Sequence, residues 1–449
     1  MTIDRSISIK RFLFQEVDNS GLIVFRVIFG LLIFLESAGA IFTGWVHETM
    51  IEPSFTFTFI GLEWLQPLPG NGMYYYYAVM AVFGLMVMLG WFYHLGISGF
   101  TILWTASYLM QKSHYNNHYY LLILLCFFMM LVPANRFYSL DVRRNPGLKK
   151  LTCPRWCYTI FQAQLGIVFT YAALAKVYPD WLNFLPIKIW FNNRSTLPVI
   201  GPLLKQEWLF PIVAYGGILF DLLITPMLLW KRTRILGLIL SLVFHGFNSA
   251  VFHIGIFPYL MIGSTVLFFE PERIRSLFFK SKPIPQLKIH ESVNLELKQK
   301  KLLIVLSIYF IIQLWLPLRH HFYEGNTFWT EEGHRMSWRM MLRTKWGHVQ
   351  FNIKNPATGE EWIVHPQEFL TNNQSQKIAK NPDMIWQFVQ YLKEHYEGVG
   401  KPGVEIYAHG SISLNGRDHR PFIDPNVDLT KVKWQRFKHS DWIMDFSDF

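Results

Sequence analysis

Long runs of apolar residues recur along the first two-thirds of the chain, separated by short polar or basic segments. Nine runs are recognisable, several of them short, near 22–43, 72–92, 95–111, 117–134, 157–176, 208–229, 235–252, 254–269 and 302–317. A helix needs about 20 largely apolar residues to cross the hydrocarbon core of a bilayer. The pattern therefore predicts a polytopic α-helical membrane domain of about nine spans over residues 1–317.

The pattern changes after residue 317, where alternation with a period of two replaces the long apolar runs. Val349, Phe351 and Ile353 alternate with polar residues, as in a half-buried strand. The sequence NPATG at 355–359 then favours a turn before a second apolar segment. This part of the chain is therefore expected to contain strands.

One amphipathic helix is also expected, from Asp383 to His395, with Asp383 in its acidic first turn. Its inner face is formed by Ile385, Phe388, Val389 and Leu392. Residues 404–414 predict another strand or two, ending at the Asn-Gly pair 415–416. Residues 318–449 are thus expected to form a small soluble β-rich (α+β) domain.

Composition agrees with membrane insertion, since 51% of the residues are hydrophobic and only 16% are charged, against about a quarter in soluble domains. Lys and Arg gather in three loops, 136–155, 231–234 and 273–301. Nine spans with a cytoplasmic N-terminus place all three loops on the cytoplasmic side and the C-terminal domain outside the cytoplasm. The formal net charge of +11 then reflects topology and not nucleic-acid binding.

Neither the N-terminal segment nor the cysteines predict a further structural feature. The first apolar run follows about twenty mostly polar residues and is long enough to span, so no cleavable signal peptide is expected. Cys126, Cys153 and Cys157 are too few for a disulfide framework. Cys153 and Cys157 have three residues between them and no second pair, so no metal site is expected there.

Lys176 is the most unusual residue of the apolar runs, because it ends one of them just before the sequence YPDW. A charged ammonium group is costly at such a position. The cost can be met by extending the side chain to the interface, by pairing with an acid, or by losing the proton. The third option turns the lysine into an amine base that works near neutral pH.

Other polar residues of the apolar runs gather near the same membrane depth: His114, Asn116, Asn117, His118, Asp221, His245, Asn248 and His253. The set predicts a partly buried pocket near the outer leaflet. Two alternatives are structural hydrogen bonding between helices and axial ligation of a b-type haem by two of the histidines. Arg26 and Glu36, ten residues apart in the first run, are not expected to pair.

A mixed apolar and cationic segment follows the last run, at residues 336–346. Met340 and Met341 provide adaptable lining for a flat or chain-like ligand. Arg339, Arg343 and Lys345 suit a carboxylate or an anion derived from carbon dioxide. A basic segment resting on lipid headgroups is the alternative.

Five blocks of the chain resemble the vitamin K-dependent gamma-glutamyl carboxylases, in the same order and including the soluble domain. They are NNHYYL at 116–121, AKVYPDW at 175–181, FHGFNSAVFHIGIFPYLM at 244–261, SWRMM at 337–341 and FIDPNVD at 422–428. The resemblance implies an HTTM-like membrane domain that holds a quinone and the catalytic pocket.

In that family a lysine amine deprotonates a reduced naphthoquinone (vitamin K hydroquinone), and dioxygen then adds. The resulting base removes a γ-proton from a protein glutamate, carbon dioxide is captured to give γ-carboxyglutamate, and the quinone leaves as its epoxide. No metal is required. On the family's positions stand the catalytic candidates Lys176, His118, Asn117 and His245, the quinone contacts Phe257 and Met261, and the further candidates Met340 and Met341.

The chain departs from the family pattern at several positions. Ala175 replaces the first lysine of the family's pair, and Val177 with Tyr178 replaces Leu-Asp, whereas the catalytic lysine is kept. Arg343 and Lys345 stand where animal members carry His and Arg, which leaves a cationic site for the glutamate substrate. The compact length is typical of a bacterial inner-membrane member that uses a menaquinone-type hydroquinone.

The sequence leaves three functions open. The first is a carboxylase that couples hydroquinone epoxidation to carboxylation of a glutamate-containing peptide or protein. The second is a hydroquinone epoxidase that has lost or changed the carboxylation half. The third is a membrane quinone- or lipid-binding module without chemistry.

Overall fold

The computed structural model describes residues 5–252, 254–286 and 296–446 of the chain, and most of them are helical. Every apolar run expected to span lies on a helix: α2 (Ser20–Phe42), α3 (Gly72–Leu89), α4 (Tyr93–Met110), α5 (Asn117–Leu131), α7 (Trp156–Ala175), α11 (Leu209–Leu229), α12 (Arg234–Phe252), α13 (Phe257–Ser264) with η4 (Thr265–Phe268), and α15 (Leu297–Trp315). In the described part of the chain, six helices are long and apolar enough to cross a membrane, namely α2, α3, α7, α11, α12 and α15.

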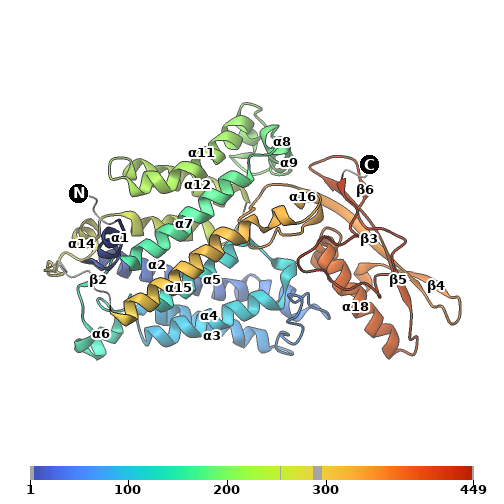
Figure 1. Ribbon diagram of the computed structural model, residues 1–449, viewed down its shortest axis with the longest axis horizontal. Coiled ribbons are helices and arrows are strands. Elements are labelled where there is room, and N and C mark those ends of the chain that lie inside the picture. The colour runs from blue at the N-terminus through green and yellow to red at the C-terminus, as the bar shows by residue number, and fades with distance from the viewer. Residues whose placement is uncertain (1–4, 253, 287–295, 447–449) are drawn as a thin grey trace.

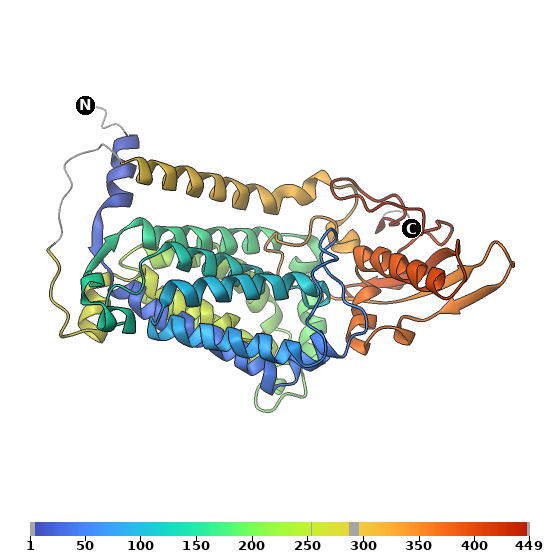
Figure 2. The same ribbon diagram turned by 90° about the horizontal axis from the view of Figure 1, so that it is seen from below.

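The long helices lie roughly side by side, and the C-terminal sheet lies at one end of the bundle (Figures 1 and 2). Consecutive helices pack in two series, α2 to α5 and α7 with α11 to α13, and α13 packs back on α2. The backbones of α2 and α3 approach closely because glycines stand at the contact. A Cβ on Gly30 would lie 2.3 Å from the backbone nitrogen of Met88. Small residues of this kind are what close helix contacts in membranes require.

Short elements connect the long ones. They are α1 (Arg5–Phe14), β1 (Glu16–Asp18), α6 (Leu140–Arg144), β2 (Thr152–Pro154), α8 (Pro179–Leu182), α9 (Leu185–Asn193), α10 (Gly201–Leu204), α14 (Pro271–Phe278), α16 (Thr327–Thr330) and α17 (Asn372–Ile378). Strands β1 and β2 pair antiparallel, so the segment before α2 is tied to the segment before α7.

The outer helices present apolar side chains on the surface. On α11, α12 and α15 the exposed positions include Leu219, Leu222, Val243, Ile239, Ile308 and Ile311. Rows of exposed apolar side chains on long helices are typical of surfaces that face lipid. Tyr309 of α15 donates a hydrogen bond to Gln164 of α7 (2.7 Å), which fixes the register of the outermost helix.

The basic loops gather at the end of the bundle opposite the C-terminal sheet (Figures 1 and 2). Lys282 and Arg275 both bind Asp18, at 2.5 and 3.1 Å. Arg234 reaches Glu270 at 3.0 Å. One end of the bundle is therefore strongly cationic.

The C-terminal domain is an antiparallel sheet of order β4-β3-β5-β6 packed against one long helix. The strands are β3 (Lys345–Lys354), β4 (Glu361–Val364), β5 (Glu405–Leu414) and β6 (Arg420–Pro421), and the helix is α18 (Pro382–Gly398). Val349, Phe351 and Ile353 are buried, as their alternation predicts. The four residues predicted to form the inner face of the helix are fully buried. Residues 405–414 form a single strand where one or two were expected over 404–414, and α17 was not expected.

Two ion clusters attach the C-terminal domain to the bundle, one partly exposed and one largely buried. The carboxylate of Asp180, just after α7, accepts hydrogen bonds from both terminal nitrogens of Arg417 at 2.6 Å. Asp383, in the first turn of α18, pairs with Lys112 (2.7 Å) and Arg335 (2.6 Å). Burial alone would raise the pKa of Asp383, but Arg335 and Lys112 outweigh burial and lower that pKa far below its usual value.

Arg26 and Glu36 do not pair, as expected from their spacing. Arg26 donates to the carbonyl oxygens of Ala134 (3.3 Å) and Tyr138 (2.6 Å) at the cationic end. Glu36 accepts a hydrogen bond from the Tyr119 hydroxyl at 2.5 Å.

Asp383→Asn should destabilise the protein strongly, by about 3–5 kcal/mol, because Lys112 and Arg335 would remain buried without a counter-charge.

The pairing of Asp383 with Lys112 and Arg335 also predicts that stability depends on pH. Since the pKa of Asp383 is depressed in the folded state, its stabilisation is present at neutral pH and is lost as the pH falls below about 4. Thermal unfolding in detergent micelles measures both effects. An equal melting temperature for Asp383→Asn and the wild type would contradict this role.

Candidate functional site

A cavity of about 290 Å³ lies where the bundle meets the C-terminal domain. Side chains from α5, α7, α11 and α12 line it, together with residues 254–257 and the segment 334–341. Its walls include the aromatic residues Phe169, Trp181, Trp190, Phe244 and Phe257. Its volume is close to the lower end of the range for small-molecule pockets, about 300 Å³, which suits a small ligand such as a flat bicyclic ring.

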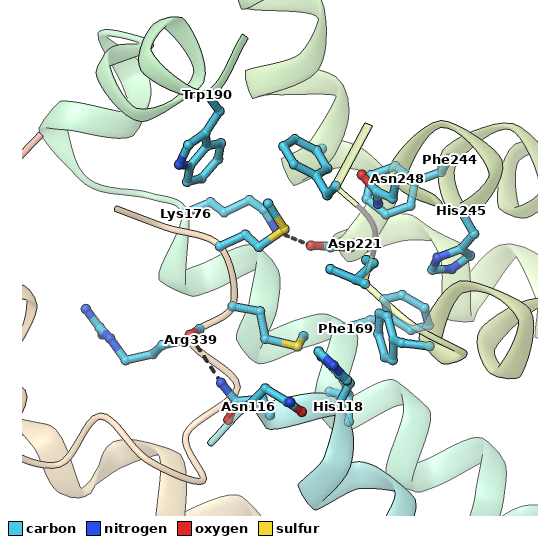
Figure 3. A pocket seen from close by; sticks show the side chains of 18 of the residues that line it. Asn116, His118, Phe169, Lys176, Trp190, Asp221, Phe244, His245, Asn248 and Arg339 are labelled. Atoms are coloured by element: carbon cyan, nitrogen blue, oxygen red, sulfur yellow. Dashed lines mark hydrogen bonds and ion pairs between the residues drawn. The ribbon is translucent and has the colours of Figure 1, made fainter. Parts of the chain in front are cut away.

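Lys176 projects into this cavity from the end of α7 (Figure 3). Its amine pairs with the carboxylate of Asp221 in the middle of α11, and both residues are buried. The amine also donates to the carbonyl oxygen of Ala172 at 3.3 Å and lies 5.7 Å from the Trp181 ring. Of the three ways to accommodate the lysine, the structure shows pairing with an acid, beside an open cavity. Gly217 lies one turn before Asp221 on α11 and leaves room for the lysine side chain.

The segment after Lys176 is held by its own side chains. The Tyr178 hydroxyl donates to the carbonyl oxygen of Leu342. The Trp181 indole donates to the carbonyl oxygen of Ala214 at 3.1 Å, which anchors this turn on α11. The YPDW exit therefore fixes where α7 stops and, with it, the position of the amine.

His118 and Asn117 enter the cavity from the first turn of α5. Asn116 caps this helix, and its side chain accepts from the Tyr119 amide at 2.7 Å. Asn117 donates to the backbone oxygen of Arg339 at 3.2 Å, so it joins the bundle to segment 334–341. The His118 ring faces Phe257, with ring centroids 5.3 Å apart.

His245 enters from α12 on the far side of Phe257, whose ring centroid lies 6.1 Å away. Phe220 and Phe244 also pack on the imidazole, at 5.7 and 5.2 Å. Its Nδ1 atom is buried and has no hydrogen-bond partner within the described residues. A buried ring nitrogen without a partner is available to a polar atom of a ligand.

The structure brings most of the predicted residues together. Lys176, Asn117, His118, His245, Phe257, Met340 and Met341 all line the cavity, and Asn116, Asn248 and Asp221 do so as well. Met261 is buried in the bundle core one turn after Phe257 and is not among the residues lining the cavity. His253 lies outside the described residues.

His114 lies away from the cavity. Its ring packs on Trp45, with centroids 5.6 Å apart, and its Nε2 lies 2.8 Å from the side-chain nitrogen of Asn373. His114 and His118 therefore do not face a common cavity, so these two histidines are not placed to ligate one haem together.

The predicted cations Arg343 and Lys345 share one acid. Glu331 binds both of them, with Lys345 at 3.0 Å. Burial alone would raise the pKa of Glu331, but the two cations outweigh burial and lower it to about 2. Burial lowers the pKa of Lys345 to about 8. The single carboxylate balances only one of the two positive charges, and neither cation is among the residues lining the cavity.

Arg339, the third cation of that segment, does line the cavity, and so does His334, which the sequence analysis did not single out. Arg339 lies at the rim, where it contacts His320 at 3.1 Å and stacks on the Phe328 ring at 4.1 Å. Burial, reinforced by neighbouring Arg343, lowers the pKa of Arg339 to about 10. Asp221 was noted only as one polar residue of its span. The rule that intramembrane charges pair would have assigned it to Lys176.

Two family models match the chain. The model described as HTTM domain matches residues 14–272, more than half of the 449 residues. The model described as vitamin K-dependent gamma-carboxylase, lumenal domain, matches residues 298–448. No solved structure matches the chain.

Gly217→Leu should weaken binding of a naphthoquinone at least about tenfold, because the new side chain enters the cavity beside Lys176 and Trp181. Quenching of tryptophan fluorescence by the quinone measures the affinity, since Trp181 and Trp190 line the cavity. Gly216→Leu is the matched control on the same helix, because a Cβ at Gly216 meets no atom within 4 Å. Equal affinities for the two variants would place the quinone elsewhere.

Proposed function

Because the chain belongs to the vitamin K-dependent gamma-carboxylase family, we propose that it couples oxygenation of a reduced naphthoquinone to carboxylation of glutamate in a peptide or protein. The observation that carries this proposal is Lys176, a buried primary amine beside a ring-sized aromatic cavity. The combination supplies a base and a site for a flat ring in a place with little water.

The cavity residues fit a naphthoquinone. Phe257 and Phe244 offer apolar ring faces, and Met340 and Met341 offer adaptable lining. The buried Nδ1 of His245 lacks a partner in the described part of the chain and suits a ring oxygen. When bound, the reduced quinone supplies, with dioxygen, the strong base that removes the γ-proton of glutamate.

The protein's own part is to hold protons and exclude water. Lys176 Nζ takes the proton from a ring hydroxyl. Asn117 fixes segment 334–341 against α5 through the Arg339 carbonyl oxygen, and this closes the cavity toward the C-terminal domain. His118 lies on the same wall, where it assists oxygenation or carboxylation. Arg339, at the rim, is placed to meet the glutamate carboxylate, while Arg343 and Lys345 add positive potential behind it.

The topology follows from the charges. The basic loops share the end opposite the C-terminal domain, so the positive-inside rule supports a cytoplasmic N-terminus and an extracytoplasmic C-terminal domain. We place the boundary between the membrane domain, 1–317, and the soluble domain, 318–449, at the end of α15. Helices α13 and η4 together are shorter than an ordinary span, and Ile254 and Phe257 at their start line the cavity. An inner-membrane location and a menaquinone-type hydroquinone complete the proposal.

Purified protein given reduced naphthoquinone, dioxygen, labelled carbon dioxide and a Glu-rich peptide should form epoxide and fix label in the peptide. Chromatography of the quinone and scintillation counting of the peptide measure the two products. Epoxide without fixed label would support the epoxidase alternative, which is favoured by the pairing of Arg343 and Lys345 with Glu331 away from the cavity. If neither epoxide nor labelled peptide forms, the result would support the third function, a quinone- or lipid-binding module without chemistry.

Lys176→Ala should abolish epoxide formation, by at least about a hundredfold, because it removes the base. Small primary amines added to the solution should restore part of the activity, since the truncated side chain leaves space beside Asp221. Lys188→Ala, which removes an exposed lysine of α9, is the control and should behave like the wild type. Undiminished epoxide formation by Lys176→Ala would exclude the lysine from the mechanism.

A further inference from the structure

Asp221 is the one carboxyl group among the described residues that line the cavity. It lies in the middle of α11, is 4% exposed, and pairs with Lys176, which is 8% exposed. In the described part of the chain, Lys176 is also the one cation paired with Asp221. The lysine therefore does not face the cavity alone but as half of an isolated buried pair.

The proton of such a pair has two positions. With the proton on nitrogen the pair is an ammonium and a carboxylate, and with the proton on oxygen it is a neutral amine and a carboxylic acid. Burial disfavours the two charges of the first form and leaves the second almost unaffected. A neutral amine thus forms without release of a proton to water, by a short movement along an existing hydrogen bond.

The hydrogen bonds of the lysine agree with this form. A neutral amine has two N–H donors and one lone pair, whereas an ammonium group has three N–H donors. Two acceptors meet Lys176 Nζ within the described residues, the Ala172 carbonyl oxygen and the Asp221 carboxyl group. With the proton on one carboxyl oxygen, the other still accepts an N–H, and the lone pair is free to face the cavity.

We propose that Asp221 is the proton-accepting partner that keeps the Lys176 amine available as a base, an inference that rests on the proposed function. The balance is simple. The proton shared by the pair moves to Asp221, and a ring O–H bond then breaks as the third N–H bond of the lysine forms. The pair now holds two protons, one more than at rest, and the ring oxygen keeps the electron pair. Asp221 acts through Lys176 and is a positioning residue in this sense.

The surroundings favour the neutral form, because no second acid lines the described cavity. The other titratable groups around the pair come from every wall: Tyr115 and His118 from the start of α5, His245 from α12, and His334 and Arg339 from segment 334–341. Arg339 extends away from Lys176 at the rim (Figure 3). The acid nearest in sequence to the lysine, Asp180, is engaged by Arg417.

Infrared spectroscopy of the complex with reduced menadione under argon tests the inference without turnover. The spectrum of the wild-type complex minus that of Asp221→Asn should contain the carbonyl band of a protonated carboxylic acid, which shifts in deuterium oxide. Bands of an ionised carboxylate in this difference would overturn the proposal. Glu36→Gln is the matched control, because it removes another partly buried acid, bonded to Tyr119, and should leave the band in place.

Two further measurements keep the test decisive. If Asp221→Asn does not fold, ¹³C-labelled aspartate in the wild-type protein should shift the acid band, and an unshifted band would overturn the proposal. In folded Asp221→Asn, kcat for epoxide should fall at least about tenfold with little change in KM for the hydroquinone. Asp221→Glu should recover part of the loss.

The two proposals fail separately. An acid band in a protein that forms no epoxide would support the Asp221 assignment and contradict the proposed function. Epoxide formation with an ionised Asp221 in the complex would support the proposed function and contradict the Asp221 assignment.

Discussion

The hydrogen-bonded pair of Lys176 and Asp221 is the interaction on which the rest of the site depends. It joins the end of α7 to the middle of α11 at a depth where an unpaired charge would be very costly. The cost of burying either group alone is what makes the pair specific, since each needs the other to be tolerated. The apolar bundle around it holds the amine where water is scarce and a flat ring has space.

The remaining contacts serve to keep this pair in place and covered. Tyr178 and Trp181 fix the turn after α7, and Asp180 fixes the C-terminal domain on that turn through Arg417. The Lys112–Asp383–Arg335 cluster holds the same domain from the side of α4 and α5. Segment 334–341 is thereby stretched across the cavity, where Asn117 binds it. The C-terminal domain therefore covers a pocket built by the helices.

Much of the fold could be predicted from the sequence because hydrophobic periodicity is a local signal. The apolar runs gave the long helices, and the alternation at Val349, Phe351 and Ile353 gave β3. Short elements were harder: α17 has no strong pattern of its own. The number of spans was also harder, because α5 and the α13–η4 segment are apolar but shorter than a bilayer.

The site was predictable to the extent that its residue types are unusual in apolar runs, as Lys176, His118 and His245 are. Pairings between distant segments were not, because no local pattern encodes them. The partner of Lys176 is 45 residues away. The same holds for Glu331, whose contacts hold Arg343 and Lys345 away from the cavity. It also holds for His114, whose ring contacts Trp45 and Asn373 outside the cavity.

The most direct test of the central claim is the absorption spectrum of a reduced naphthoquinone bound to the protein without oxygen. At neutral pH we predict the spectrum of an ionised ring hydroxyl in the wild-type complex and of an undissociated one in Lys176→Ala. The same undissociated spectrum in both complexes would contradict a role for this buried amine as the base.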